Sequence, residues 1–242
     1  MRGEELTVIQ KAVLERLSSL NLPTGAHILD APCGGLAALT LALSAQGFSV
    51  IGADMDPEAA ARLGNSFAQV NLDAPLPWEE NTFDAIFSTE GVEHLENHFS
   101  FLRELCRVLK PGGVLVLTTP NITALRSRVR FFGSGFFGRD GRPLNESARH
   151  PLHHIGLATL PELRYELHMS GFQLLEVRHT HIKPISYPYY IFAPWMWLYT
   201  KLAFRKEKDP LQRQRNREIL KTLLSPSVLL GECLMLIARK SV

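Results

Sequence analysis

The chain has 242 residues, of which 45% are hydrophobic and 21% are charged, and its formal net charge is +2. These values are typical of a globular protein with a sizeable core, and the near balance of charge gives no reason to expect nucleic acid as a partner. Three cysteines lie far apart in the sequence, and acids stand at the start where an export signal would carry basic and then apolar residues. We therefore expect reduced thiols and a cytoplasmic protein.

The first half of the chain alternates between helical and strand patterns. Apolar residues at helical spacing predict an amphipathic helix over 6–17, and short apolar runs then predict strands separated by helices. Strands that alternate with helices indicate a parallel sheet covered on both faces. The expected strands lie at 26–31, 48–54, 67–72, 82–89 and 114–120, and the helices between them at 36–47, 57–64 and 97–110.

The alternation breaks after Pro120 and returns later. A stretch rich in Arg, Phe and Gly follows Pro120, and we interpret it as an insertion or lid in which Arg126, Arg128 and Arg130 recognise an anionic group or form a solvated helix face. A helix is expected over 159–171, where Thr159 and Glu162 form a capping-box pattern. Further strands are expected over 172–182 and 232–240.

The turn after the first expected strand, "DAPCGG", predicts a nucleotide site of an unusual kind. It lacks both the G-x-G-x-x-G fingerprint and the Lys and Ser or Thr of a phosphate-binding loop. Asp30 precedes the turn, where an acid suits a cationic ligand, and Asp54 ends the second strand, where an acid commonly binds ribose hydroxyls. A nucleoside with a cationic end and no phosphates points to S-adenosylmethionine.

Four segments in order resemble the motifs of the class I S-adenosylmethionine-dependent methyltransferases. They are "ILDAPCGG", "VIGADMDPE", "NLDAPLPWEENTFDAIFSTEGVEHLENH" and "FLRELCRVLKPGGVLVLTTPN". The resemblance implies an α/β fold, with a doubly wound, Rossmann-like mixed sheet of seven strands whose last strand is antiparallel. It also implies a single domain over 1–242, with a core at 22–121, 155–180 and 231–240 and a lid and cap at 122–154 and 181–230.

The same resemblance implies which residues bind the cofactor. The methionine end would lie against the turn after the first strand, the ribose against Asp54, and the adenine against Met55. Pro32 and Leu36 depart from the family pattern because they stand where glycines are expected. The complete expected set is Asp30, Ala31, Cys33, Gly34, Gly35, Asp54, Met55, Asn71, Leu72 and Ser88.

The segment "TEGVEHL" carries Glu90, Glu93 and His94 at positions i, i+3 and i+4, a spacing that puts them on one face of a helical turn. The pattern resembles the metal site of ubiquinone O-methyltransferases and of small-RNA 2′-O-methyltransferases, and His154 stands where the latter carry a further ligand. Three alternatives stay open. In the first, these four residues hold Mg²⁺ or Mn²⁺. In the second, His94 or His154 acts as a metal-free base, with Glu90 as a further catalytic residue. In the third, Glu93 and His94 only brace the loop.

The predicted function is an S-adenosylmethionine-dependent methyltransferase that methylates a hydroxyl or carboxyl group of a small molecule by in-line displacement. The alternatives are a metal-dependent RNA 2′-O-methyltransferase and a non-catalytic binding module with the same fold. Trp and Tyr beside basic residues over 187–221 favour a peripheral membrane contact, a cap over the substrate or a dimer contact. The sequence gives neither the methyl acceptor nor the oligomeric state.

Overall fold

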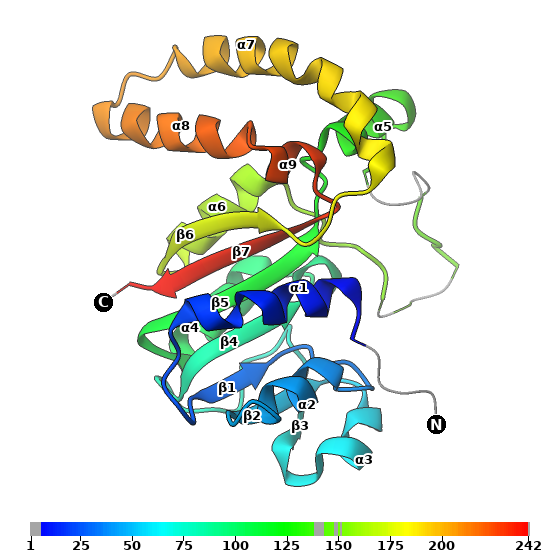
Figure 1. Ribbon diagram of the computed structural model, residues 1–242, viewed down its shortest axis with the longest axis vertical. Helices are drawn as coiled ribbons and strands as arrows, with labels where there is room; N and C mark the ends of the chain where they lie inside the picture. Colours follow the sequence, from blue (N-terminus) through cyan, green and yellow to red (C-terminus); the bar gives the residue numbers. More distant parts are fainter. Residues whose placement is uncertain (1–5, 138–142, 148–149, 151, 242) are drawn as a thin grey trace.

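A seven-stranded mixed sheet forms the centre of the computed structural model, which describes residues 6–137, 143–147, 150 and 152–241 (Figure 1). The strand order is β3-β2-β1-β4-β5-β7-β6, and β7 runs antiparallel to both of its neighbours. The expected doubly wound sheet with an antiparallel last strand is therefore confirmed. The strands are β1 (His27–Asp30), β2 (Ser49–Asp54), β3 (Phe67–Gln69), β4 (Phe83–Thr89), β5 (Leu109–Pro120), β6 (Phe172–His179) and β7 (Cys233–Lys240).

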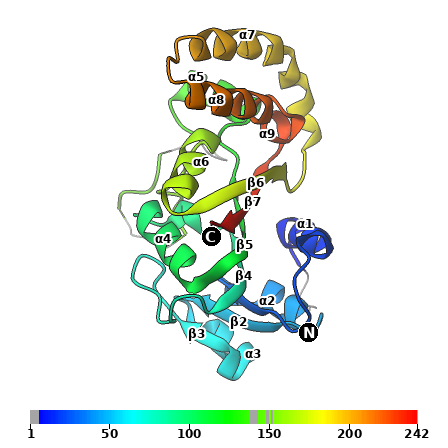
Figure 2. The ribbon, with the colours of Figure 1, turned by 90° about the vertical axis from the view of Figure 1, so that its left-hand side faces the viewer.

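Helices cover both faces of the sheet and build a separate layer beyond the β6 edge (Figures 1 and 2). One face packs against α1 (Val8–Leu17) and α2 (Ala38–Ser44), and the other against α4 (His98–Val108) and α6 (Leu160–Met169). The remaining helices are α3 (Ala60–Leu63), α5 (Leu125–Ser134), α7 (Ala193–Phe204), α8 (Pro210–Leu223) and α9 (Pro226–Leu230), with 3-10 turns η1 (Ser18–Leu20), η2 (Pro57–Ala59), η3 (Gly64–Ser66), η4 (Val92–His94) and η5 (Pro184–Phe192).

The central strands are apolar at nearly every position because both of their faces are buried. Successive side chains of a strand point to opposite faces. On β7, Leu234 and Leu236 pack into the α4 and α6 layer, whereas Met235 and Ile237 pack into the α1 and α2 layer. The continuous run "CLMLIA" therefore belongs to a strand buried between two layers of helices.

Several element boundaries differ from those expected. Strand β5 begins at Leu109 rather than at residue 114. The Lys-Pro-Gly-Gly segment was expected to end the preceding helix, but it lies within the strand. The helix expected over 57–64 divides into η2 and the short α3. The capping box is confirmed, since the Glu162 carboxylate accepts hydrogen bonds from both the backbone N–H and the hydroxyl of Thr159, each at 2.7 Å.

Part of the segment that was expected to form a lid belongs to the hydrophobic core. Leu125, at the start of α5, is fully buried and packs with Leu229 and Leu230 of α9. The cap region consists of η5, α7, α8 and α9. Part of the expected lid, at 138–142, 148–149 and 151, lies outside the described residues, and the division of the chain into core and cap stays a prediction.

The order of the strands locates a ligand site. Strands β1 and β4 are neighbours, but the chain leaves β1 for α2 on one face and leaves β4 for α4 on the other. Such a reversal leaves a crevice outside the carboxyl ends of the two strands, where open α/β sheets bind ligands.

Replacing Leu234 by Ala removes a fully buried side chain near the start of β7 and leaves a cavity between the sheet and its helices. We expect the free energy of unfolding to fall by about 2–5 kcal/mol in chemical denaturation. The control is Leu175→Ala on β6, a side chain that is 45% exposed and whose loss is expected to cost much less. An equal fall in the free energy of unfolding for the two variants would contradict the buried position of Leu234 on β7.

Candidate active site

Two buried polar atoms without a partner among the described residues belong to the adjacent strands β1 and β4, where the strand order reverses. Asp30 ends β1 and is fully buried, and its Oδ2 accepts a 2.6 Å hydrogen bond from the Thr40 hydroxyl. Within the described residues its Oδ1 has no hydrogen-bond partner, and neither has the Oγ of the buried Ser88 on β4. Burial raises the pKa of Asp30 to about 7, and the nearby Asp54 adds to the shift although the Thr40 bond opposes it. A buried carboxyl with an unsatisfied oxygen fits a cationic ligand group.

The turn after β1 is held by the acid that ends β2. The Gly34 N–H donates to Asp54 Oδ2 at 2.7 Å, and the Asp56 N–H donates to Asp54 Oδ1 at 3.0 Å. Gly34 has a φ of +66°, in the left-handed region that favours glycine. Next to it, a Cβ on Gly35 would lie 2.9 Å from Glu58 Oε2. Asp54 therefore fixes the turn, and its role in binding the ribose stays a prediction.

Pro32 stands where a glycine was expected, and its ring packs against the loop that follows β4. A Cβ on Gly91 would overlap the Pro32 ring, so the two loops approach as closely as a glycine allows. Cys33, the next residue, is buried, and burial raises the pKa of its thiol to about 12. It is therefore a neutral thiol at neutral pH rather than a nucleophile.

The residues expected around the adenine lie after β2 and β3. Met55 is 55% exposed, and its backbone carbonyl accepts a hydrogen bond from Gln69 at 3.1 Å. The Asn71 side chain accepts from the Asp73 N–H at 3.0 Å, and Leu72 is buried beside it. The structure thus brings both segments to the carboxyl edge of the sheet, and the binding roles of these residues stay predictions.

The segment "TEGVEHL" is not one helical turn. Glu90 has a left-handed backbone with a φ of +51°, and only Val92–His94 form the 3-10 turn η4. Glu93 is fully buried, and its Oε2 accepts a 3.1 Å hydrogen bond from the Thr119 hydroxyl while its Oε1 has no partner among the described residues. Burial raises the pKa of Glu93 to about 7.

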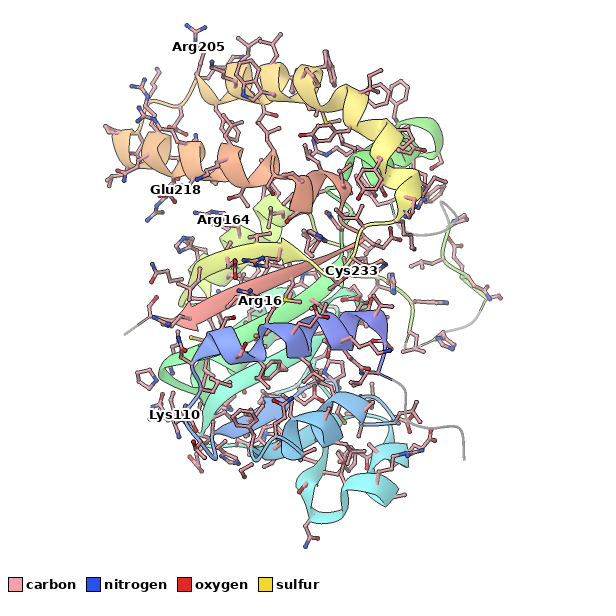
Figure 3. All side chains as sticks on the ribbon, viewed as in Figure 1. Arg16, Lys110, Arg164, Arg205, Glu218 and Cys233 are labelled. Atoms are coloured by element: carbon pink, nitrogen blue, oxygen red, sulfur yellow. The ribbon has the colours of Figure 1, made fainter. Side chains whose placement is uncertain are left out.

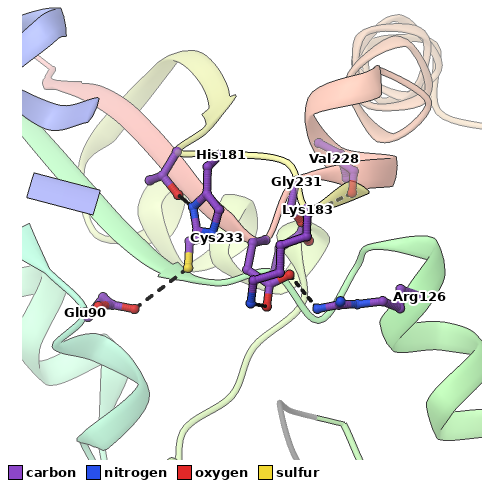
Figure 4. A network of polar contacts seen from close by, with 10 residues as sticks. Glu90, Arg126, His181, Lys183, Val228, Gly231 and Cys233 are labelled. Atoms are coloured by element: carbon purple, nitrogen blue, oxygen red, sulfur yellow. Dashed lines mark hydrogen bonds and ion pairs between the residues drawn. The ribbon is translucent and has the colours of Figure 1, made fainter. Parts of the chain in front are cut away.

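The two histidines of the predicted site lie together. His94 Nδ1 is 3.1 Å from the His153 carbonyl oxygen, and since a carbonyl only accepts, Nδ1 is the donor in this contact and Nε2 is the ring nitrogen left for a ligand. The rings of His94 and His154 meet edge to face, with centroids 4.9 Å apart. Glu93, His94 and His154 each place one ligand atom within 4.8 Å of the others. Glu90 is not one of these three residues, but its charge acts on Glu93, and Cys233 Sγ is 3.8 Å from Glu90 Oε1 (Figure 4).

A cavity of about 350 Å³ opens at the carboxyl end of β5, next to Glu90. On its wall, Arg126 and Lys183 donate to the two oxygens of Glu232 at 2.5 and 2.7 Å (Figure 4). Burial alone would raise the pKa of Glu232, but these two cations hold it below its usual value. His154 and Arg130 also line the cavity. The Asn121 amide fixes the same wall by donating to the carbonyl oxygens of Val228 and Gly231.

Most of these cavity residues have no sequence signal. Among the three arginines singled out, Arg126 and Arg130 line the cavity, whereas Arg128 donates to the Thr123 carbonyl oxygen at 2.6 Å. The remaining polar lining includes residues that the sequence analysis missed, namely His181, Lys183, Glu232 and Cys233. They lie just after β6 and around the start of β7, and the antiparallel pairing of these two strands, with the bridge between Ile182 and Gly231, brings them together.

The sheet is doubly wound, acids end β1 and β2, the first turn is not a phosphate-binding loop, and a small-molecule cavity adjoins it. Together these features define a nucleoside-binding α/β enzyme. Residues 29–117 match the family model described as "Methyltransferase domain". The chain is 30% identical over 173 residues to the ubiquinone biosynthesis O-methyltransferase of Xanthomonas axonopodis pv. citri. The alignment covers 68% of this chain and 70% of that protein. The chain therefore belongs to the class I S-adenosylmethionine-dependent methyltransferases, and the expected cofactor is S-adenosylmethionine.

Two further comparisons agree with this assignment. The mitochondrial ubiquinone biosynthesis O-methyltransferase of Homo sapiens is 40% identical over 113 residues, which are 42% of this chain but only 30% of the human protein. The crystal structure of an S-adenosylmethionine-dependent methyltransferase from Mesorhizobium loti has a TM-score of 0.57 at 17% identity and covers 98% of this chain and 100% of its own. At that identity the structural match supports the fold alone.

The titration of Asp30 predicts how cofactor binding depends on pH. A cationic ligand binds the ionised carboxyl, so below pH 7 binding must first expel a proton, and the affinity should fall by about tenfold per pH unit. Calorimetry with S-adenosylmethionine between pH 5 and 8 checks this expectation.

Asp30→Asn separates this role from a structural one. We expect the variant to lose most of its affinity for S-adenosylmethionine and the pH dependence with it, while its thermal stability is unchanged or higher because a buried ionisable group has gone. A variant that binds normally would contradict the role of Asp30.

Proposed function

We propose that the chain transfers a methyl group from S-adenosylmethionine to an oxygen atom of a small molecule. The observation that carries this proposal is the cavity of about 350 Å³ that adjoins the carboxyl end of β4 and is lined by Glu90 and His154. Its volume suits a small molecule rather than a polymer chain. The names of the Xanthomonas and human relatives, both O-methyltransferases, support oxygen as the acceptor atom.

The bound cofactor would supply an activated methyl group on a sulfonium centre. The acceptor hydroxyl must lie in line with that methyl group and lose its proton as the new bond forms, so positioning provides much of the rate. In our proposal His154, at the cavity wall, accepts the proton. His94 supports the His154 ring, and its own orientation is fixed by the His153 carbonyl oxygen. A general base of this kind contributes about 10²–10⁴-fold.

The charges around the cavity favour a neutral or weakly acidic acceptor. Arg126, Arg130 and Lys183 line it together with Glu90 and Glu232, so cations only slightly outnumber carboxylates. Arg126 and Lys183 both bind Glu232, which leaves less of their charge for a substrate. A phenol or a carboxylic acid that ionises on binding fits this wall better than a phosphorylated molecule.

Metal-assisted transfer is a second candidate because of the grouping of Glu93, His94 and His154. The unpartnered Glu93 Oε1 and the lone pair on His94 Nε2 are the kinds of ligand atom that a divalent cation needs. Mg²⁺ or Mn²⁺ there would lower the pKa of the acceptor hydroxyl. Activity that EDTA removes and Mn²⁺ restores, together with Mn²⁺ binding that Glu93→Gln abolishes, would favour this route over the metal-free base.

His154→Ala tests the proposed base. With the chain, S-adenosylmethionine and a panel of small phenols, alcohols and carboxylic acids, we expect kcat to fall by about 10²–10⁴-fold while cofactor affinity stays the same. Transfer of a labelled methyl group and mass spectrometry of the product identify the methylated atom. His153→Ala is the matched control, because it removes a neighbouring imidazole that does not line the cavity and keeps the backbone carbonyl that orients His94.

Three outcomes would contradict the proposal. Full activity of His154→Ala would exclude the base, and a product methylated on nitrogen or carbon would exclude O-methylation. If single-stranded RNA ends accept the methyl group and the small molecules do not, the chain is an RNA 2′-O-methyltransferase instead.

A further inference from the structure

Helix α7 and the turn η5 before it form an outer layer that exposes large apolar side chains. Helix α7 contacts α8 and η5, and the partly buried stripe on that side is formed by Ala193, Met196, Thr200 and Phe204. None of the twelve residues of α7, all of which the structure describes, is fully buried. Figures 1 and 2 show α7 as the outermost element at the end of the molecule opposite α3.

The face of α7 opposite the packed stripe is apolar, where a helix on the surface of a soluble protein is normally polar. At 100° per residue, Trp195, Leu198 and Leu202 lie on that opposite face, and they are 63%, 50% and 50% exposed. The exposed apolar side chains of η5 and α7 are Ile185, Tyr187, Tyr190, Ile191, Phe192, Trp195, Trp197, Leu198, Tyr199 and Leu202. We call these ten residues the aromatic face.

The end of α5 extends the aromatic face. Helix α5 packs against η5, and Phe132 near its C-terminus is 93% exposed, while Phe131 and Phe136 are 42% and 40% exposed. Monomeric soluble proteins rarely leave so many large apolar side chains together in water, so this surface marks a contact with another apolar phase or molecule.

Positive charge is concentrated beside the aromatic face. Residues 201–221 contain eight Lys and Arg against three Asp and Glu, whereas the rest of the chain has 18 Lys and Arg against 21 Asp and Glu. The Lys201 ammonium lies 4.5 Å from the centre of the Trp197 ring. Arg205, directly after α7, points outward from this layer (Figure 3).

We infer that the aromatic face, with the end of α5, docks on the surface of an anionic lipid bilayer. Trp and Tyr beside Lys and Arg is the composition of the zone between acyl chains and headgroups, and the basic segment complements anionic lipids. Helix α7 would lie in the plane of the membrane. Among the described residues, no helix is both long enough and apolar enough to span a bilayer.

A second copy of the chain fits this surface less well than a bilayer does. In a two-fold dimer the same surface meets itself, so the basic segments of the two copies would come close together and repel each other. A helix–helix contact also needs only a stripe of apolar residues, whereas the exposed apolar residues of α7 also include Trp197 and Tyr199, to the two sides of its outward face.

The full-length chain can be tested by flotation with vesicles of phosphatidylcholine alone and of phosphatidylcholine mixed with phosphatidylglycerol. We expect tighter binding to the anionic vesicles, weaker binding at high salt, and a blue shift of tryptophan fluorescence as Trp195 and Trp197 leave water. Leu198→Ser/Leu202→Ser should weaken binding by at least about tenfold. Arg205→Gln/Lys206→Gln should weaken binding to anionic vesicles by about fivefold for each charge removed.

Tyr165→Ser/Met169→Ser is the matched control. It also replaces two exposed apolar residues four positions apart on one helix, with exposures of 60% and 53%, but on α6 rather than on the aromatic face. Its vesicle binding should equal that of the unchanged chain, and circular dichroism verifies that each variant is folded. No binding to anionic vesicles, equal binding to neutral ones, or a soluble dimer that Leu198→Ser/Leu202→Ser dissociates would each overturn the inference. The readout needs no methyl acceptor, so it is independent of the proposed activity.

Discussion

The functional region depends on one constraint of chain topology, the departure of α2 and α4 to opposite faces of the sheet from the adjacent strands β1 and β4. Because neither helix covers the carboxyl ends of these strands, the loops that follow them can approach each other and a ligand. The turn after β1, the acid after β2 and the loop after β4 all meet there. The small-molecule cavity adjoins this region because β5 is the next strand along.

Burial of carboxyl groups gives this region its chemical character. Asp30 and Glu93 are both fully buried, each has one oxygen without a partner among the described residues, and burial raises the pKa of each to about 7. An unpaired buried carboxyl destabilises a folded protein, increasingly so as the pH rises through its folded pKa. Two such groups at adjacent strand ends are typical of a site organised for ligands rather than for stability.

The sequence was sufficient where the pattern is local. Alternating strands and helices predicted the parallel sheet, and the two acids expected at the cofactor site, Asp30 and Asp54, do end β1 and β2. The helical spacing rule did not apply to "TEGVEHL", because the left-handed Glu90 precedes a 3-10 turn, and the three residues whose ligand atoms meet are Glu93, His94 and His154. Lys183 and Glu232 line the cavity through pairing of distant strands, and no spacing along the chain encodes that contact.

The contact between Pro32 and Gly91 links two positions that are far apart in the chain. While proline occupies position 32, position 91 has no room for a side chain, because even a Cβ would overlap the ring. A glycine at position 32 would remove the ring and relieve that restriction. The two positions are therefore expected to change together during evolution, so that relatives with a glycine-rich first turn tolerate larger residues after the fourth strand and relatives with the proline keep glycine there.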